Sequence, residues 1–244
     1  MNTQTHHEAL QEQAAALRSA AVRAGGEATV PTCPRWDVRA LVRHLAKVYG
    51  MVLLALDTEP DAQRPQPESA PEAFDAALDC WDERLAALLP KLAERDPHRP
   101  VWAFFPDGTP AAWARRMLHE TAIHRLDVEL AAGGAEHGLV FEPQLAADGA
   151  DEMLSVIAPL GDWSLAQRTG KVLYHAADAE RAWLVTYRSG AAPQVGRPDD
   201  AALDHEVDAT VAGTADAVYR RVWGRPSSAV VTGDAELADA VRGR

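Results

Sequence analysis

The sequence predicts an α+β protein, with a four-helix bundle in the first two-thirds of the chain and a small α+β domain after it. Two observations predict this fold class. Up to about residue 160, apolar residues recur every three or four positions in long segments, which is the pattern of amphipathic helices. Further on, short β-rich runs alternate with short helical ones, as in α+β domains. We therefore expect a bundle over 1–160 and a second domain over 165–244.

The first two helices are marked by their ends. An alanine-rich stretch over 6–24 is followed by two glycines, and glycine is common just after the last turn of a helix. Asp37 is of the residue type that caps a helix N-terminus. It precedes a segment over 38–56 whose apolar residues gather on one side of a helix. That apolar side is expected to face a bundle core.

The third and fourth helices complete the predicted bundle. Pro71 is expected to open the third, because proline is favoured in the first helical turn. Its apolar residues repeat at helical spacing: Phe74, Leu78, Trp81, Leu85, Leu88 and Leu92. In the fourth helix Thr109 and Pro110 are the expected cap and first residue, and Gly133 and Gly134 its expected end. Four helices joined by loops indicate a bundle.

The elements of the second part are shorter. A fifth helix is expected over about 143–158. Runs rich in β-branched and aromatic residues then predict strands. The expected order is a strand over 171–177, a strand over 182–190, a strand over 206–213, a helix over 214–225, a strand over 229–233 and a helix over 235–242.

Composition limits the function classes. The chain has 244 residues, 47% of them hydrophobic, and a net charge of −12, which argues against a nucleic-acid partner because phosphates require a basic face. Its two cysteines form no disulfide framework and no cysteine-rich zinc site. No run of 18 apolar residues occurs, so we expect neither signal peptide nor membrane span. These features favour a cytoplasmic protein, monomeric or a small homo-oligomer, that binds small molecules.

The segment MLHETAIHRLDVE, residues 117–129, carries the chemistry. Two ligands on one helix face need a spacing of three or four residues, and Glu120 and His124 meet this rule. His119 precedes His124 by five residues, points away from that face and is expected not to be a ligand. The residues sharing the face are Trp113, Met117, Glu120, His124 and Val128. An isolated ionised carboxylate among apolar side chains costs several kcal/mol, so Glu120 needs a partner, and a metal ion would serve.

His44 is the best third ligand, because it lies on the flank of the apolar side of its own helix. Two histidines and one carboxylate with open positions are typical of a catalytic zinc site, and they also suit other divalent metals. Alternatives remain. Glu120 and His124 would form a core hydrogen bond without metal, and His44 would be structural or a surface residue. Asp127 would either orient a ligand or pair with a surface arginine.

Four segments together resemble the mycothiol-dependent maleylpyruvate isomerase family. They are VPTCPRWDVRALVRHL (30–45), HETAIHRLDVE (119–129), VDATVAGTADAVYRRVWGR (207–225) and VVTGDAELA (230–238). The resemblance covers nearly the whole chain and implies a DinB-like metal-binding bundle followed by a small α+β domain. It implies a divalent metal, usually zinc, held by His44, Glu120 and His124. It also implies an arginine of the second domain near the metal, for which we choose Arg225, with Arg221 in reserve.

The function that follows is a metal-dependent enzyme with mycothiol as thiol cofactor or cosubstrate. The thiolate would add to an electrophilic small molecule, giving either cis–trans isomerisation of a maleylpyruvate-like enedioate or thiol S-transfer, with Arg225 holding a substrate carboxylate. Isomerase is favoured by the resemblance alone. Arg35 and Arg116 are candidates to hold the polar body of the thiol. The alternatives are a thiol-independent metal hydrolase and a non-catalytic protein that binds a metal or a small ligand.

Overall fold

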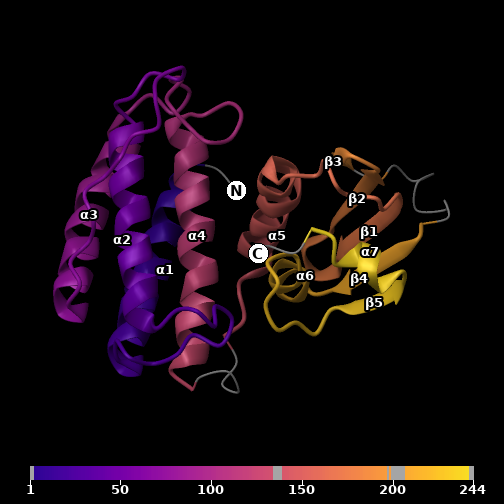
Figure 1. The fold of residues 1–244 in the computed structure, drawn as a ribbon, viewed down its shortest axis with the longest axis horizontal. Helices are drawn as coiled ribbons and strands as arrows, with labels where there is room; N and C mark the ends of the chain where they lie inside the picture. The colour runs from indigo at the N-terminus through magenta and orange to yellow at the C-terminus, as the bar shows by residue number, and fades with distance from the viewer. Residues whose placement is uncertain (1–2, 134–138, 197, 199–206, 242–244) are drawn as a thin grey trace. The chain divides into compact units, whose positions relative to one another are not determined.

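The computed structural model describes residues 3–133, 139–196, 198 and 207–241. It forms two compact units, Met1–Leu139 and Val140–Arg244, whose elements appear in Figure 1. The first unit holds the helices expected for the bundle and the second holds the sheet. The boundary between the units in the chain follows residue 139, before the fifth helix. The change in sequence pattern had placed this boundary after that helix, at 160–165. None of the described helices combines the length and apolarity needed to cross a membrane.

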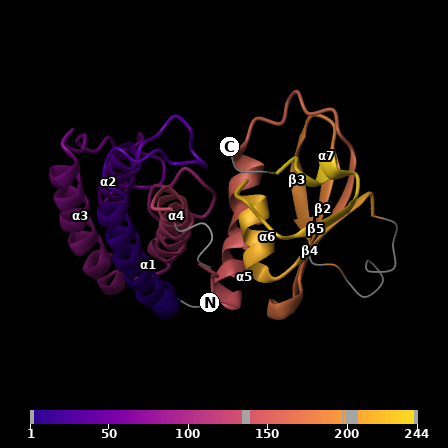
Figure 2. The same cartoon turned by 90° about the horizontal axis from the view of Figure 1, so that it is seen from below.

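The first unit is a bundle of α1 (Thr3–Ala24), α2 (Val38–Ala55), α3 (Phe74–Glu94) and α4 (Pro110–Ala131). Helices α1 and α2 lie between α3 and α4 (Figure 2), and α1 packs on α4 while α2 packs on α3. The largest fully buried side chains of the unit form its core: Trp81, Trp113, Tyr49, Leu10, Leu17, Leu41, Leu45, Leu56, Leu88 and Leu92. Burying each such side chain contributes about 1.5–3 kcal/mol, so this core fixes the helices that carry the site.

The capping and terminating residues expected for the bundle helices are found with one exception. Asp37 Oδ1 accepts a hydrogen bond of 2.7 Å from the backbone N–H of Ala40 at the start of α2. Thr109 and Pro110 begin α4 as predicted, and Gly133 follows it with φ 78°. Pro71, however, does not open the third helix.

That helix begins at Phe74, with Ala73 as a cap that makes no side-chain hydrogen bond. Had Pro71 been its first residue, Ala70 would have been the cap, and an alanine side chain cannot accept a hydrogen bond in either place. The chain therefore lacks the local signal that fixes a helix start, and the prediction of this boundary was wrong.

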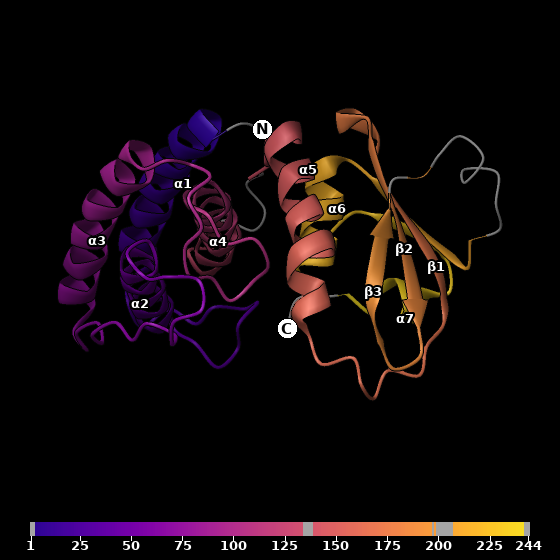
Figure 3. The same ribbon diagram turned by 90° about the horizontal axis from the view of Figure 1, so that it is seen from above.

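The second unit is a five-stranded sheet in the order β3-β2-β1-β4-β5. The strands are β1 (Gly170–Ala176), β2 (Arg181–Arg188), β3 (Ala191–Gly196), β4 (Ala209–Gly213) and β5 (Val230–Gly233). Among the described strand pairs, β1–β4 alone is parallel. Helices α5 (Pro143–Glu152) and α6 (Ala215–Val222) lie along one face of the sheet (Figure 3). The short remaining helices are a π-turn at Met153–Ile157, 3₁₀ turns at Ala158–Leu160 and Ala177–Ala179, and α7 (Ala235–Ala238).

The strand β3 was not expected from the sequence. Its sequence, AAPQVG, has a single β-branched residue, and Pro193 cannot donate a hydrogen bond to a neighbouring strand. The strand lies at the edge of the sheet and pairs only with β2 among the described strands, which is where proline is tolerated. Gly134, Glu206 and Arg242, which delimit expected elements, lie outside the described residues.

Candidate metal centre

Three side chains of the bundle bring ligand atoms together. His44 comes from α2, while Glu120 and His124 lie one turn apart on α4. One ligand atom from each lies within 4.8 Å of the other two. Glu120 Oε1 is 2.8 Å from His44 Nε2 and 3.5 Å from His124 Nε2. Ligands bound to zinc at about 2.0–2.2 Å in a tetrahedron lie roughly 3.3–3.6 Å apart, so this donor set fits a divalent metal after only small shifts.

Glu120 is surrounded by positive charge and hydrogen-bond donors. Its side chain is 15% exposed, and Arg116, one turn earlier on α4, donates to Oε2 at 2.8 Å. Burial alone would raise the pKa of the Glu120 carboxyl, but hydrogen bonds with His124 and His44 and the charge of Arg116 outweigh burial and hold that pKa well below its usual range. The carboxylate is therefore ionised at neutral pH, as a metal ligand must be.

A buried carboxylate orients His124. Nδ1 of His124 lies 2.9 Å from Asp127 Oδ2, and Thr32 donates to the other oxygen of Asp127 at 2.6 Å. Burial lowers the pKa of His124, but the hydrogen bonds with Asp127 and Glu120 outweigh it and raise that pKa to about 9. With Nδ1 held by Asp127, Nε2 is the nitrogen that faces Glu120. Metal-ligating histidines commonly have this carboxylate partner.

Residues of the loop before α2 lie against one side of the triad formed by His44, Glu120 and His124. The Trp36 ring centroid lies 4.9 Å from that of His44 and 5.9 Å from that of His124. Cys33 Sγ lies 3.9 Å from Asp127 Oδ2. Sequence reasoning assigned no role to Trp36 or Thr32, since a loop has no periodicity from which facing residues can be read. The one available signal was their position in the segment 30–45 that also carries His44.

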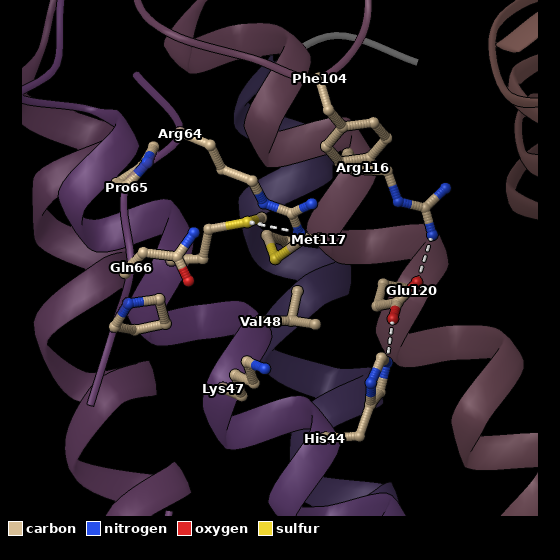
Figure 4. A pocket seen from close by; sticks show the side chains of 12 residues that line it. His44, Lys47, Val48, Arg64, Pro65, Gln66, Phe104, Arg116, Met117 and Glu120 are labelled. Carbon is tan, nitrogen blue, oxygen red and sulfur yellow. Dashed lines mark hydrogen bonds and ion pairs between the residues drawn. The ribbon is translucent and has the colours of Figure 1, made fainter. Parts of the chain in front are cut away.

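A cavity of about 480 Å³ opens beside His44 and Glu120 within the bundle unit. Figure 4 shows Arg116, Glu120 and His44 along one wall of it and Arg64 reaching in from the opposite loop. The lining side chains come from two helices and two loops: His44, Lys47, Val48 and Met51 of α2, Arg116, Met117 and Glu120 of α4, Arg64, Pro65, Gln66 and Pro67 of the α2–α3 loop, and Phe104 of the α3–α4 loop. Arg116, expected from the sequence near the mouth of the site, thus lines the cavity and also binds Glu120.

The other residues singled out from the sequence lie elsewhere. His119 is fully buried and is not part of the ligand cluster. Arg225 belongs to the second unit, where its Nη1 donates to the carbonyl oxygen of Trp223 at 2.6 Å. Arg221 of the same unit forms an ion pair with Asp239. Cys80 is a half-buried residue of α3.

Comparison with known proteins bears on both units. A family model described as the mycothiol maleylpyruvate isomerase N-terminal domain matches residues 7–129. The fold resembles a crystal structure of the mycothiol-dependent maleylpyruvate isomerase, with a TM-score of 0.60 and 14% identity, and one of its histidine-to-alanine mutants, with 0.61 and 12%. Each match covers 95% of this chain and 93% of the other. No curated protein sequence matches the chain.

Proposed function

The chain belongs to the mycothiol maleylpyruvate isomerase family, since the family's N-terminal domain spans residues 7–129, and on that premise we propose a metal-dependent enzyme that uses mycothiol. Its substrate is an electrophilic small molecule. The reaction is either cis–trans isomerisation of a maleylpyruvate-like enedioate or S-transfer, in which the whole thiol adds to the electrophile through its sulfur.

The observation that carries this proposal is the convergence of His44, Glu120 and His124, with ligand atoms within 4.8 Å of one another, beside a cavity large enough for a small substrate. These three residues would hold the metal, with Zn²⁺ the expected ion. Three protein ligands leave a position for an outside ligand. A bound metal lowers the pKa of a thiol ligand, so that the thiolate is present at neutral pH.

The chain's own residues prepare this site. Asp127 holds the ring of His124 through Nδ1, and Arg116 holds one oxygen of Glu120 while the other faces the histidines. Both ligands are thereby fixed before a metal binds, which reduces the ordering that binding requires. The ring of Trp36 lies against both imidazoles.

Mycothiol would supply a thiolate that adds reversibly to an activated double bond, which permits isomerisation or, without elimination, S-transfer. We propose that Arg225 binds a substrate carboxylate. Its guanidinium provides the paired donors that suit a carboxylate. Replacing Arg225 by alanine should lower turnover and leave the zinc content unchanged.

The experiment that tests the proposal is turnover of maleylpyruvate by zinc-loaded protein with and without mycothiol. We expect saturable dependence on the thiol, and loss of both zinc and turnover in His44→Ala, Glu120→Ala and His124→Ala. The matched control is His119→Ala, a buried histidine of the same helix, which should keep its zinc. Undiminished turnover without thiol would favour a metal hydrolase, and zinc binding without turnover of any electrophile would favour a non-catalytic binding protein.

A further inference from the structure

The cavity beside His44, Glu120 and His124 is lined by three cationic side chains and one carboxylate. Lys47, Arg64 and Arg116 line it, and Glu120 is the single carboxylate among the lining residues. Arg116 is engaged with Glu120. Within the described residues, the structure gives no acidic partner to Lys47 or Arg64. Both residues are exposed, and without acidic partners they give this side of the cavity a local positive potential in a protein of net charge −12.

Both cations are placed by the fold toward the same space. Lys47 follows His44 by three residues on α2, so the two side chains share a helix face. Arg64 belongs to the loop between α2 and α3, and its Nη2 lies 3.7 Å from Sδ of Met51, a lining residue on the next turn of α2. Figure 4 shows the Arg64 guanidinium extending from the loop across the cavity, opposite the Arg116–Glu120 pair.

The loop that carries Arg64 is braced against the bundle. We call residues 57–73 the strap. Arg84 of α3 donates to the backbone oxygens of Ala46 at 2.7 Å and of Glu68 at 3.1 Å, which ties the strap to α2. Gly50 of α2 lets the strap come close, because a Cβ there would lie 3.0 Å from Cβ of Pro67 and 2.9 Å from Nη1 of Arg84. Arg64 therefore reaches the cavity from a braced segment, which reduces the entropy lost when it binds a ligand.

We propose that Lys47 and Arg64 form an anion subsite that binds a carboxylate of the electrophilic substrate and selects for small organic acids. The lining residues Val48, Met51, Met117 and Phe104 offer apolar contacts to its carbon skeleton. The identity of the ligand as an electrophile rests on the proposed function, but the subsite itself rests on the cavity and its two cations. The subsite is separate from the metal ligands, so it is testable without metal.

The test is calorimetric binding of maleate, without thiol, to the full-length protein in its zinc-free and zinc-loaded forms. Arg64→Gln and Lys47→Gln should each weaken binding by about tenfold, the loss of one charged hydrogen bond, and the double variant by more. Dimethyl maleate, which has the same skeleton without charge, should bind far more weakly than maleate. Higher ionic strength should weaken maleate binding further.

Arg188→Gln and Lys171→Gln are matched controls, since both residues are exposed, lie in the second unit and do not line the cavity. Equal maleate affinity in the wild type and the double variant would overturn the subsite, as would equal affinity for the ester and the diacid. Mycothiol-dependent turnover is measured separately. If turnover depends on thiol but maleate affinity does not depend on the two cations, only the subsite is wrong. If affinity depends on them but no turnover occurs, only the proposed function is wrong.

Discussion

Arg116 and Glu120 form an ion pair of 2.8 Å across one turn of α4, through the carboxylate oxygen Oε2. The other oxygen, Oε1, lies 2.8 Å from His44 Nε2. The arginine thus fixes which oxygen faces the histidines. It also partly neutralises a carboxylate that is 15% exposed.

Arg116→Gln should destabilise the zinc-free protein more than the zinc-loaded one. Removing one partner of a buried ion pair leaves a poorly compensated charge and costs about 3–5 kcal/mol, and a bound divalent cation would replace the lost compensation. Urea unfolding with and without zinc measures both values. The loss of unfolding free energy caused by the substitution should be at least halved when zinc is present. An equal loss in both forms would mean that Glu120 does not bind the metal.

Zinc binding should release protons below pH 9. The pKa of His124 is raised to about 9 in the metal-free protein, so near pH 7 a bound metal must displace its proton. Calorimetry in buffers of different ionisation enthalpy should give about one proton per zinc at pH 7 from this residue. Zinc affinity should rise with pH until the pKa is reached.

The same pKa shift has a consequence for the metal-free protein. Because the folded-state pKa of His124 lies above its unfolded value of 6.5, the ionised histidine stabilises the fold fully below pH 6.5, and this contribution disappears as pH rises through about 9.

Asp127→Asn removes one of the interactions that raise the pKa of His124. The number of protons released when this variant binds zinc should therefore fall at a lower pH than in the wild type. The same pH profile in both would contradict the role given to Asp127.

Arg84→Met should weaken maleate binding and leave zinc affinity unchanged. The substitution keeps much of the side chain's length but removes the donors that hold the strap at Ala46 and Glu68. Competition with a zinc chelator and maleate calorimetry report the two affinities independently. Arg18→Met is the control, since Arg18 pairs with the exposed Asp82 away from the cavity. A parallel loss of zinc affinity would show that Arg84 supports the bundle as a whole rather than the strap.

The double variant Cys33→Ser, Cys80→Ser should retain thiol-dependent turnover. Cys33 Sγ lies 3.9 Å from Asp127 Oδ2, and a serine hydroxyl can make a comparable contact there. Cys80 is half-buried in α3 and lies outside the triad. Steady-state rates at several mycothiol concentrations check this. If the double variant were inactive while retaining its zinc, a cysteine of the chain would be the nucleophile instead.

The convergence of the three candidate ligand residues could be predicted from the sequence because helical geometry determines much of it locally. Glu120 and His124 are four residues apart, which places them together on any regular helix. His44 could be chosen because it flanks the apolar side of α2. That side packs into the bundle core, which brings α2 close to α4. The caps Asp37 and Thr109 were predictable for the same reason, since capping depends on one side chain and the next turn.

The surroundings of the cluster could not be predicted in the same way. Trp36, Thr32 and Arg64 lie in loops, where no periodicity indicates which way a side chain points. The unit to which residues 143–152 belong was equally hidden. An amphipathic helix shows that it has a partner but not which one, and α5 packs with α6 of the second unit.

The most direct test of the account is a crystal structure of the zinc-soaked protein with diffraction data collected on both sides of the zinc absorption edge. We expect one anomalous peak within about 2.0–2.2 Å of ligand atoms from His44, Glu120 and His124, with Asp127 still bound to the second nitrogen of His124. A peak elsewhere, with Glu120 still hydrogen-bonded to His44, would contradict the proposed metal centre.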